Sequence, residues 1–175
     1  YASMNDVEYA EPNYRIQLDD PIEKNNDISP RSAASVFRSD EKVPNDPLFA
    51  KQWALNNQGA AGGTARADID AVAAWQTTTG SSEVVVAVLD SGVELDHEDL
   101  KNNIWTRPDD LAAYSDAELG ELDDLRGFNG VDLNDDPSDD NGHGTHCAGI
   151  IGAEGNNGLG ITGVNWNGKI MPLKF

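Results

Sequence analysis

The sequence is poor in cysteine, in basic residues and in long apolar runs, and each shortage excludes a class of protein. Its single cysteine, Cys147, excludes an internal disulfide. Twelve Lys and Arg against 31 Asp and Glu give a formal net charge of −19, which argues against nucleic acid as a partner. The longest apolar run, residues 84–89, is too short to cross a membrane, so we expect no membrane partner.

What remains is the composition and patterning of one folded α/β domain. The 175 residues are 38% hydrophobic and 25% charged, which is typical of a globular chain with a sizeable core. The run 84–89 predicts a strand buried on both faces of a parallel sheet, and residues 170–175 predict another strand. We expect helices over residues 70–80, with Asp70 as N-cap, and over 143–153, and a short helix over 112–119. In this architecture functional groups gather at the carboxyl ends of the strands.

Two short motifs carry the strongest chemical signal. Asp90 ends the apolar run, and the following Ser91-Gly92 allows a sharp turn, so the Asp90 carboxylate can face a cleft. His143 stands between two glycines at the start of a predicted helix, where another backbone or a substrate can approach closely. The helix dipole disfavours a charged imidazole there, so a carboxylate such as Asp90 is needed to stabilise it. The pair indicates two thirds of a catalytic triad.

Each of these residues also has another interpretation. Alone, Asp90 could simply cap a turn. His143, His146 and Asp90 could bind a metal, although the H-x-x-H spacing lacks the interposed glutamate of zinc proteases. Cys147 could be a nucleophile, but on an apolar helix we interpret it as a small buried hydrophobe. His97 has no evident partner in the sequence.

Together the motifs resemble a known family. The DSG after an apolar strand and the GHGTHCAG 53 residues later are similar to the aspartate and histidine blocks of the subtilisin-like serine proteases. The seven residues specified by the histidine block would recur by chance about once in 10^9 positions. The resemblance covers residues 44–175, because NDPLFAKQWAL also matches the usual start of the mature enzyme. It implies a subtilisin-like three-layer α/β fold with a mainly parallel sheet, with only the N-terminal portion in this chain.

The resemblance implies a secreted or cell-surface serine endopeptidase that acts on protein or peptide substrates. Asp90 and His143 would be two members of its Asp–His–Ser triad. No serine here stands in the family's G-T-S-x-A setting, so the partner that completes the site would be the C-terminal remainder of the peptidase domain. The chain begins at Tyr1 without a targeting signal, and we expect it to be a processed or excised piece that is inactive alone.

The first 43 residues are expected to lie outside the peptidase domain. VEYAEPNY, within residues 1–16, resembles the final strand of the family's inhibitory propeptide, which would be a further partner. Residues 17–43 are polar and proline-punctuated, as in a linker or processing region. We therefore expect three segments: a propeptide tail over 1–16, a linker over 17–43, and the N-terminal part of the peptidase domain over 44–175.

Calcium is the expected cofactor. The glycines of GAEGNNGLGI, residues 152–161, let successive carbonyls turn toward one point, and hard cations take such oxygen ligands. An ordinary solvated glycine loop is the alternative. Matching the family's strong calcium site to this sequence implies three side-chain ligands and three carbonyl ligands. These are the side chains of Asp46, Asp99 and Asn157 and the carbonyls of Glu154, Leu159 and Ile161.

A second set of oxygen-bearing side chains stands at alternating positions and is similar to a weaker calcium site of some relatives. Its members are Asn129, Asp132, Asn134 and Asp136. The spacing is not that of an EF-hand, and a solvated acidic loop explains it equally well.

A function of another class is a non-catalytic, calcium-binding interaction module with the same fold. The presence of both Asp90 and His143 argues against this alternative. A module freed from catalysis has no physical need for either side chain.

Overall fold

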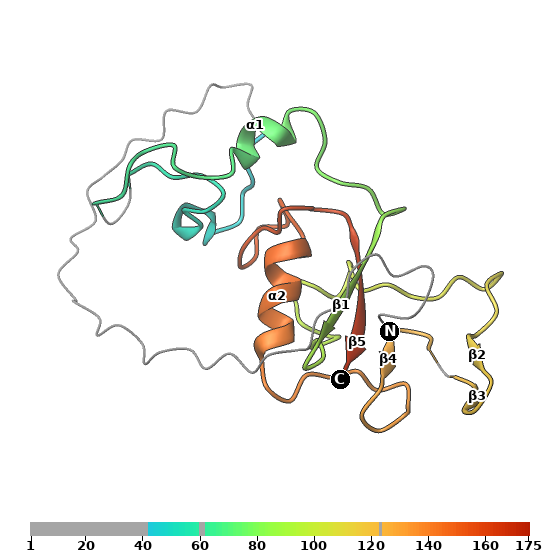
Figure 1. Ribbon diagram of the computed structural model, residues 1–175. Coiled ribbons are helices and arrows are strands. Elements are labelled where there is room, and N and C mark those ends of the chain that lie inside the picture. Colours follow the sequence, from blue (N-terminus) through green and yellow to red (C-terminus); the bar gives the residue numbers. More distant parts are fainter. Residues whose placement is uncertain (1–41, 60–61, 123) are drawn as a thin grey trace, which may run out of the picture.

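The computed structural model describes residues 42–59, 62–122 and 124–175 (Figure 1). Its elements follow the chain as η1 (Phe49–Lys51), α1 (Ala71–Trp75), β1 (Val85–Asp90), β2 (Ser115–Asp116), β3 (Gly120–Glu121), β4 (Phe128–Asn129), α2 (His143–Gly152) and β5 (Lys169–Lys174). The expected propeptide tail, residues 1–16, and all but the end of the expected linker lie outside the described residues. No helix in the described part of the chain is long and apolar enough to cross a membrane.

A parallel sheet in the order β1-β5-β4 forms the centre of the structure (Figure 1). Strand β1 pairs with β5 from Val85↔Lys169 to Asp90↔Lys174. Strand β4 pairs with the other edge of β5. The chain passes from β1 through the hairpin of β2 and β3 to β4, and then through α2 to β5. Helix α2 packs on the sheet and forms the crossover between the parallel strands β4 and β5 that is expected of an α/β fold. Both long strands and α2 lie within one residue of their predicted ranges.

Two apolar clusters form the core. The first joins the sheet to α2 through Val88 of β1, Ile170 of β5 and Ala148 of α2. The second centres on Trp75 of α1, which packs against Phe49 and Trp166 at ring-centroid distances of 5.9 and 5.0 Å. This second cluster anchors the segment before β1 to the loop between α2 and β5. That loop contains four of the six predicted calcium ligands, Glu154, Asn157, Leu159 and Ile161.

The side chains of strand β1 alternate between buried and exposed, contrary to the prediction that the strand is buried on both faces. Val88 is buried against α2, whereas Val85 and Leu89 are 41% and 63% exposed. No described segment covers that second face. Since side chains alternate along a strand, Asp90 shares the face of Val88 and therefore faces α2.

The helix predicted over residues 70–80 is wrong in length, because α1 ends at Trp75. Asp70 adopts a left-handed backbone with φ +56° and makes no side-chain cap bond. After Trp75 and the C-cap residue Gln76 come three consecutive threonines, which are weak helix formers, and then Gly80 with φ +98°. These residues favour an early end to the helix.

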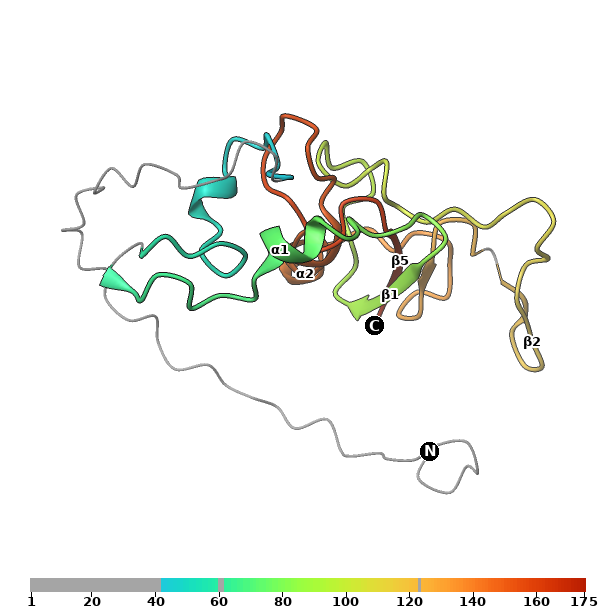
Figure 2. The ribbon, with the colours of Figure 1, turned by 90° about the horizontal axis from the view of Figure 1, so that it is seen from above.

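The short helix predicted over residues 112–119 is also wrong, because this segment belongs to the hairpin of β2 and β3. The Asp116 carboxylate accepts hydrogen bonds from the amides of Glu118 and Leu119. Such a bond offers the backbone a turn in place of a helix. Gly120, at φ +77°, completes the reversal. The hairpin lies on the far side of the sheet from α1 (Figures 1 and 2).

Candidate active site

Asp90 and His143 meet where the end of β1 faces the start of α2. The Nδ1 atom of His143 lies 2.7 Å from Oδ1 and 2.8 Å from Oδ2 of Asp90. A carboxylate can only accept, so Nδ1 carries the proton and Nε2 is left as a base. The Asp90 side chain is 18% exposed and that of His143 is 67% exposed. Among the described residues, Nε2 of His143 has no hydrogen-bond partner.

The glycines of the two motifs allow this close approach. A Cβ atom on Gly144 would collide with the carbonyl oxygen of Gly92 and would come within 3.0 Å of the Asp90 Cβ. Gly92 itself has φ +110°, and a side chain there would meet the backbone of Pro137 and Ser138. A larger residue at Gly144 would therefore push the strand and the helix apart, and one at Gly92 would displace the loop that leads into α2.

Hydrogen bonds keep Asp90 ionised. Burial raises the pKa of this carboxyl, but the amide of Ser91 at 2.7 Å and the His143 ring outweigh it. The net effect holds the pKa of Asp90 below its ordinary value. At neutral pH the carboxylate can therefore hold one imidazole tautomer and stabilise the charged ring.

Cys147 is the third potential ligand side chain near this pair, with Sγ 3.7 Å from His143 Nδ1. Burial raises the pKa of the Cys147 thiol, and the charge of Asp90 adds to that effect. A protonated thiol is a poor nucleophile, and Cys147 packs against the core as a small hydrophobe would. His146 contacts the Gly142 carbonyl oxygen at 2.6 Å, and the structure does not group it with Asp90 and His143. His97 Nδ1 accepts from the Asp99 amide at 3.2 Å.

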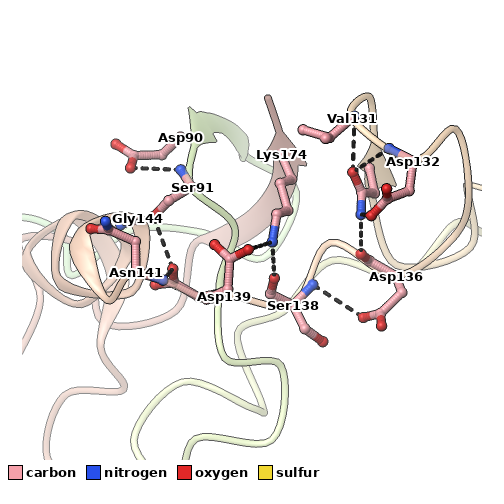
Figure 3. Close-up of polar contacts among 12 residues, drawn as sticks. Asp90, Ser91, Val131, Asp132, Asp136, Ser138, Asp139, Asn141, Gly144 and Lys174 are labelled. Atoms are coloured by element: carbon pink, nitrogen blue, oxygen red, sulfur yellow. Dashed lines mark hydrogen bonds and ion pairs between the residues drawn. The ribbon is translucent and has the colours of Figure 1, made fainter.

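Asp139 is a polar residue of this site that our sequence reasoning missed. Its Oδ1 accepts from the Ser91 hydroxyl at 2.8 Å and from the amides of Asn141 and Gly142. Its Oδ2 accepts from the amide and hydroxyl of Thr145. Figure 3 shows the carboxylate between the end of β1 and the start of α2. The aspartate four residues before the histidine was the available signal, but Asp140 beside it carries the same charge.

Lys174 holds the neighbouring loop from the side of β5 (Figure 3). Its Nζ lies 2.9 Å from the Asp140 carboxylate and donates to the Ser138 carbonyl at 2.9 Å. The Lys174 side chain is largely buried, whereas that of Asp140 is exposed. Asp139 and Asp140 therefore face opposite partners, α2 and β5.

The three side chains of the first predicted calcium site, those of Asp46, Asp99 and Asn157, come together beside the loop over residues 154–161. Asp46 and Asp99 are only 4% and 3% exposed. Asp46 accepts from the amides of Asn156 and Asn157, while Asp99 accepts from the Ile161 amide and the Asn157 side chain. Asn157 turns its nitrogen toward Asp99, and its oxygen accepts from the Leu159 amide.

The donor set around these two carboxylates fits a hard cation. No basic side chain within the described ranges forms an ion pair with Asp46 or Asp99. The carbonyl oxygens of Glu154, Leu159 and Ile161 accept no hydrogen bond from residues that the structure describes. Buried carboxylates without a counter-charge are costly, and free carbonyls beside them are suitable ligands. Binding through the Asn157 oxygen would require that amide to turn.

The second set forms one loop that is closed by its own hydrogen bonds (Figure 3). The Asn129 side chain accepts from the amides of Val131 and Asp132 and donates to the Asp132 carboxylate and the Asp136 carbonyl. Asn134 and Asp136 each accept from an amide two residues ahead. The alternating polar residues therefore form Asx-type turns in this structure.

Comparison with known proteins agrees with this architecture. Residues 81–175 match the family model described as the subtilase family, and the chain belongs to that family. It is similar to subtilisin-like protease 1 of Plasmodium berghei, with 35% identity over 74% of this chain and 21% of the relative. It is also similar to human proprotein convertase subtilisin/kexin type 4, with 37% identity over 76% of this chain and 15% of the relative.

Solved structures show the same fold. A serine protease of Aeromonas sobria, in complex with its chaperone ORF2, matches 75% of this chain and 20% of its own, at 29% identity and a TM-score of 0.58. A protease from Pseudoalteromonas arctica PAMC 21717 matches 75% of this chain and 38% of its own, at 32% identity and a TM-score of 0.52. The subtilisin-like α/β fold is thereby confirmed. The chain spans only a minor part of the length of these proteins.

The contacts of Asp90 lead to a prediction on its titration. Its carboxyl should titrate below 3.8, the ordinary aspartate value, and His143→Ala should raise its pKa by removing a hydrogen bond and a charge. The stabilisation from the lowered pKa is present above 3.8 and is lost as the pH falls through the folded-state pKa. NMR of the 13C-labelled carboxyl measures both effects. His146→Ala is the control, and an equal effect of the two substitutions would contradict the prediction.

Proposed function

We propose that this chain supplies the aspartate and histidine of a subtilisin-like serine endopeptidase. The observation that carries the proposal is the contact of His143 Nδ1 with both oxygens of an ionised Asp90, at 2.7 and 2.8 Å. Membership of the subtilase family supports it. A calcium-binding module without catalysis would not need this contact, which is why we favour the enzyme.

The geometry suits proton transfer to and from a serine. With the proton fixed on Nδ1, the exposed Nε2 of His143 can take the proton of a serine hydroxyl as that oxygen attacks a peptide carbonyl. The imidazolium then forms beside the Asp90 carboxylate, which stabilises its charge. His143 next gives the proton to the leaving amine. Asp90 orients and stabilises throughout without taking the proton.

Protein or peptide substrates and the C-terminal remainder of the peptidase domain are the proposed partners. The serine would come from that remainder, since no serine here has the family's sequence setting. The proposed location is secreted or cell-surface, as the family resemblance implies. The propeptide tail over residues 1–16 is the third proposed partner.

Calcium is the proposed cofactor at the first site. The side chains of Asp46, Asp99 and Asn157 and three carbonyls of the 154–161 loop would hold it. Bound there, calcium would neutralise two buried carboxylates and tie the segment before η1 to the loop after α2. The second site, in the loop from Asn129 to Asp136, stays a prediction, because a cation there would have to replace existing amide bonds.

Peptidase activity should require Asp90, His143 and the remainder of the domain. The isolated chain should not hydrolyse a generic peptide substrate, because it lacks the nucleophile. In the complete protein, His143→Ala should lower kcat by up to about 10^6-fold, as triad knockouts do. Asp90→Asn should lower kcat by about 10^4-fold, because an amide no longer holds the proton of the His143 ring on Nδ1 and the ring can adopt the other tautomer.

The matched control for Asp90→Asn is Asp96→Asn, which removes the same charge from an exposed side chain whose ion-pair partner among the described residues is Arg126, at 3.5 Å. It should leave kcat near the wild-type value. Hydrolysis of a chromogenic peptide measures each rate. If the isolated chain hydrolysed the peptide and His143→Ala abolished that activity, the proposal that the nucleophilic serine comes from the C-terminal remainder would be refuted.

Calcium should stabilise the folded chain through Asp46 and Asp99. A free calcium concentration of 100 times Kd stabilises by about 2.7 kcal/mol, so chelation should lower the melting temperature measurably. Asp99→Asn should remove most of that calcium dependence, whereas Asp96→Asn should keep it. Thermal unfolding with calcium and with a chelator measures the shift, and Asp132→Asn tests the second site. Equal melting temperatures in both media would exclude calcium binding.

Maturation should cut the chain between Ile16 and Pro44. This polar segment contains Arg31, Arg38 and Lys42 as possible cut points, and exposed linkers are where chains are nicked. N-terminal sequencing of the matured protein identifies the junction. A start well beyond Leu48 would contradict both this division and the calcium proposal, because it would remove Asp46.

A further inference from the structure

The Asp139 carboxylate connects the two elements that carry the catalytic pair. On the strand side, it accepts from the hydroxyl of Ser91, the residue directly after Asp90. On the helix side, it accepts from the Gly142 amide just before His143 and from the Thr145 amide two residues after it. The connection is therefore made directly after Asp90 on the strand and on both sides of His143 on the helix.

Ser91 links the strand to α2 in two ways, through Asp139 and directly. Its hydroxyl donates to Asp139 and accepts from the Gly144 amide at 3.1 Å. Short bonds thus form a closed path from Asp90 through Ser91 and Asp139 to the first turn of α2, which begins at His143. A helix cap needs only bonds to amides, whereas this group also binds the strand.

The strength of the path comes from an ionised acceptor. Burial raises the pKa of Asp139, but the Thr145 hydroxyl and the amides of Gly142, Asn141 and Thr145 outweigh it. The pKa of Asp139 is thereby held well below its usual range. Hydrogen bonds to a charged acceptor are about twice as strong as neutral ones, and a negative charge at a helix N-terminus is favourable.

We propose that Asp139 is a positioning residue for the Asp90–His143 pair, acting through Ser91 and the first turn of α2. Its effect on catalysis rests on the endopeptidase function proposed above. Its effect on the geometry of the pair does not. Asp139 itself touches neither the His143 ring nor the Asp90 carboxylate in any hydrogen bond that the described residues form.

Three variants distinguish the effect of the hydrogen bonds through Asp139 from the effect of its negative charge. Asp139→Asn puts an NH2 group where one oxygen now accepts amide or hydroxyl bonds, and it also removes a charge. Ser91→Ala breaks the strand side of the path without changing any charge. Asp140→Asn removes the same charge one residue away, at an exposed side chain whose partner is Lys174.

The first readout is the tautomer of His143 in the 175-residue chain, followed by 15N NMR of the ring at a pH where the imidazole is neutral. The wild type should hold the proton on Nδ1. Asp139→Asn should move a measurable fraction to Nε2, and Ser91→Ala should give a smaller change in the same direction. Asp140→Asn should match the wild type. A purely structural cap would leave the tautomer of folded variants unchanged.

The second readout is the kinetics of the complete protein. Asp139→Asn should lower kcat by about 10^2-fold, the typical cost of a catalytic group displaced by about 1 Å. KM should change little, because the hydrogen bonds of Asp139 within the described part of the chain go to Ser91 and to residues 141–145, where they hold the catalytic pair in place. Asp140→Asn should leave both constants near wild type. If Asp139→Asn does not fold, Ser91→Ala decides the question alone.

Wild-type tautomer and kcat in the folded Asp139→Asn or Ser91→Ala variant would overturn the proposal. An effect of Asp140→Asn as large as that of Asp139→Asn would also overturn it, because charge alone would then be responsible. If the complete wild-type protein shows no peptidase activity, the endopeptidase function fails. The tautomer measurement still decides the positioning role in that case.

Discussion

The contact between the end of β1 and the start of α2 is the constraint on which the site depends. The side chains of Asp90 and His143 are short, so the backbone of β1 and that of α2 must lie close together for the carboxylate to contact the imidazole ring. Gly144 permits this because a Cβ atom there would collide with the Gly92 carbonyl oxygen. The strand and helix are therefore packed almost backbone to backbone. Any shift of α2 passes directly into the 2.7 Å contact between Asp90 and His143.

The acidic composition serves local structure as much as surface charge. Asp46 and Asp99 accept hydrogen bonds from backbone amides of a segment that is distant in the sequence. Asp139 accepts hydrogen bonds from amides of the residues that follow it. Asp116 closes the turn of the β2–β3 hairpin in the same way. Carboxylates accept strong hydrogen bonds from backbone amides, so they can hold loops that have no regular secondary structure. Part of the net charge of −19 is thus the cost of fixing the loops that surround α2 and β5.

Sequence patterns predicted the parts of the fold in which one signal dominates. The apolar run and the glycine-flanked histidine located β1, α2 and the Asp90–His143 pair, because burial and close packing both depend on side-chain size. The helix predicted over residues 112–119 was wrong because the Asp116 side chain competes with a helix for backbone amides. The helix predicted over residues 70–80 was too long because weak helix formers and a glycine follow α1. The burial of β1 was wrong for Val85 and Leu89, since apolar periodicity does not say which segment covers a face.

Asp139 could not be chosen from the sequence because Asp140 has the same charge and lies one residue nearer to His143. The difference arises only from what stands on each side of the loop. Lys174, at the end of β5, binds Asp140 and the Ser138 carbonyl. The loop thus places Asp140 beside β5 and Asp139 beside α2. The loop over residues 138–140 is therefore the point at which the end of β1, the end of β5 and the start of α2 are all joined by hydrogen bonds or an ion pair.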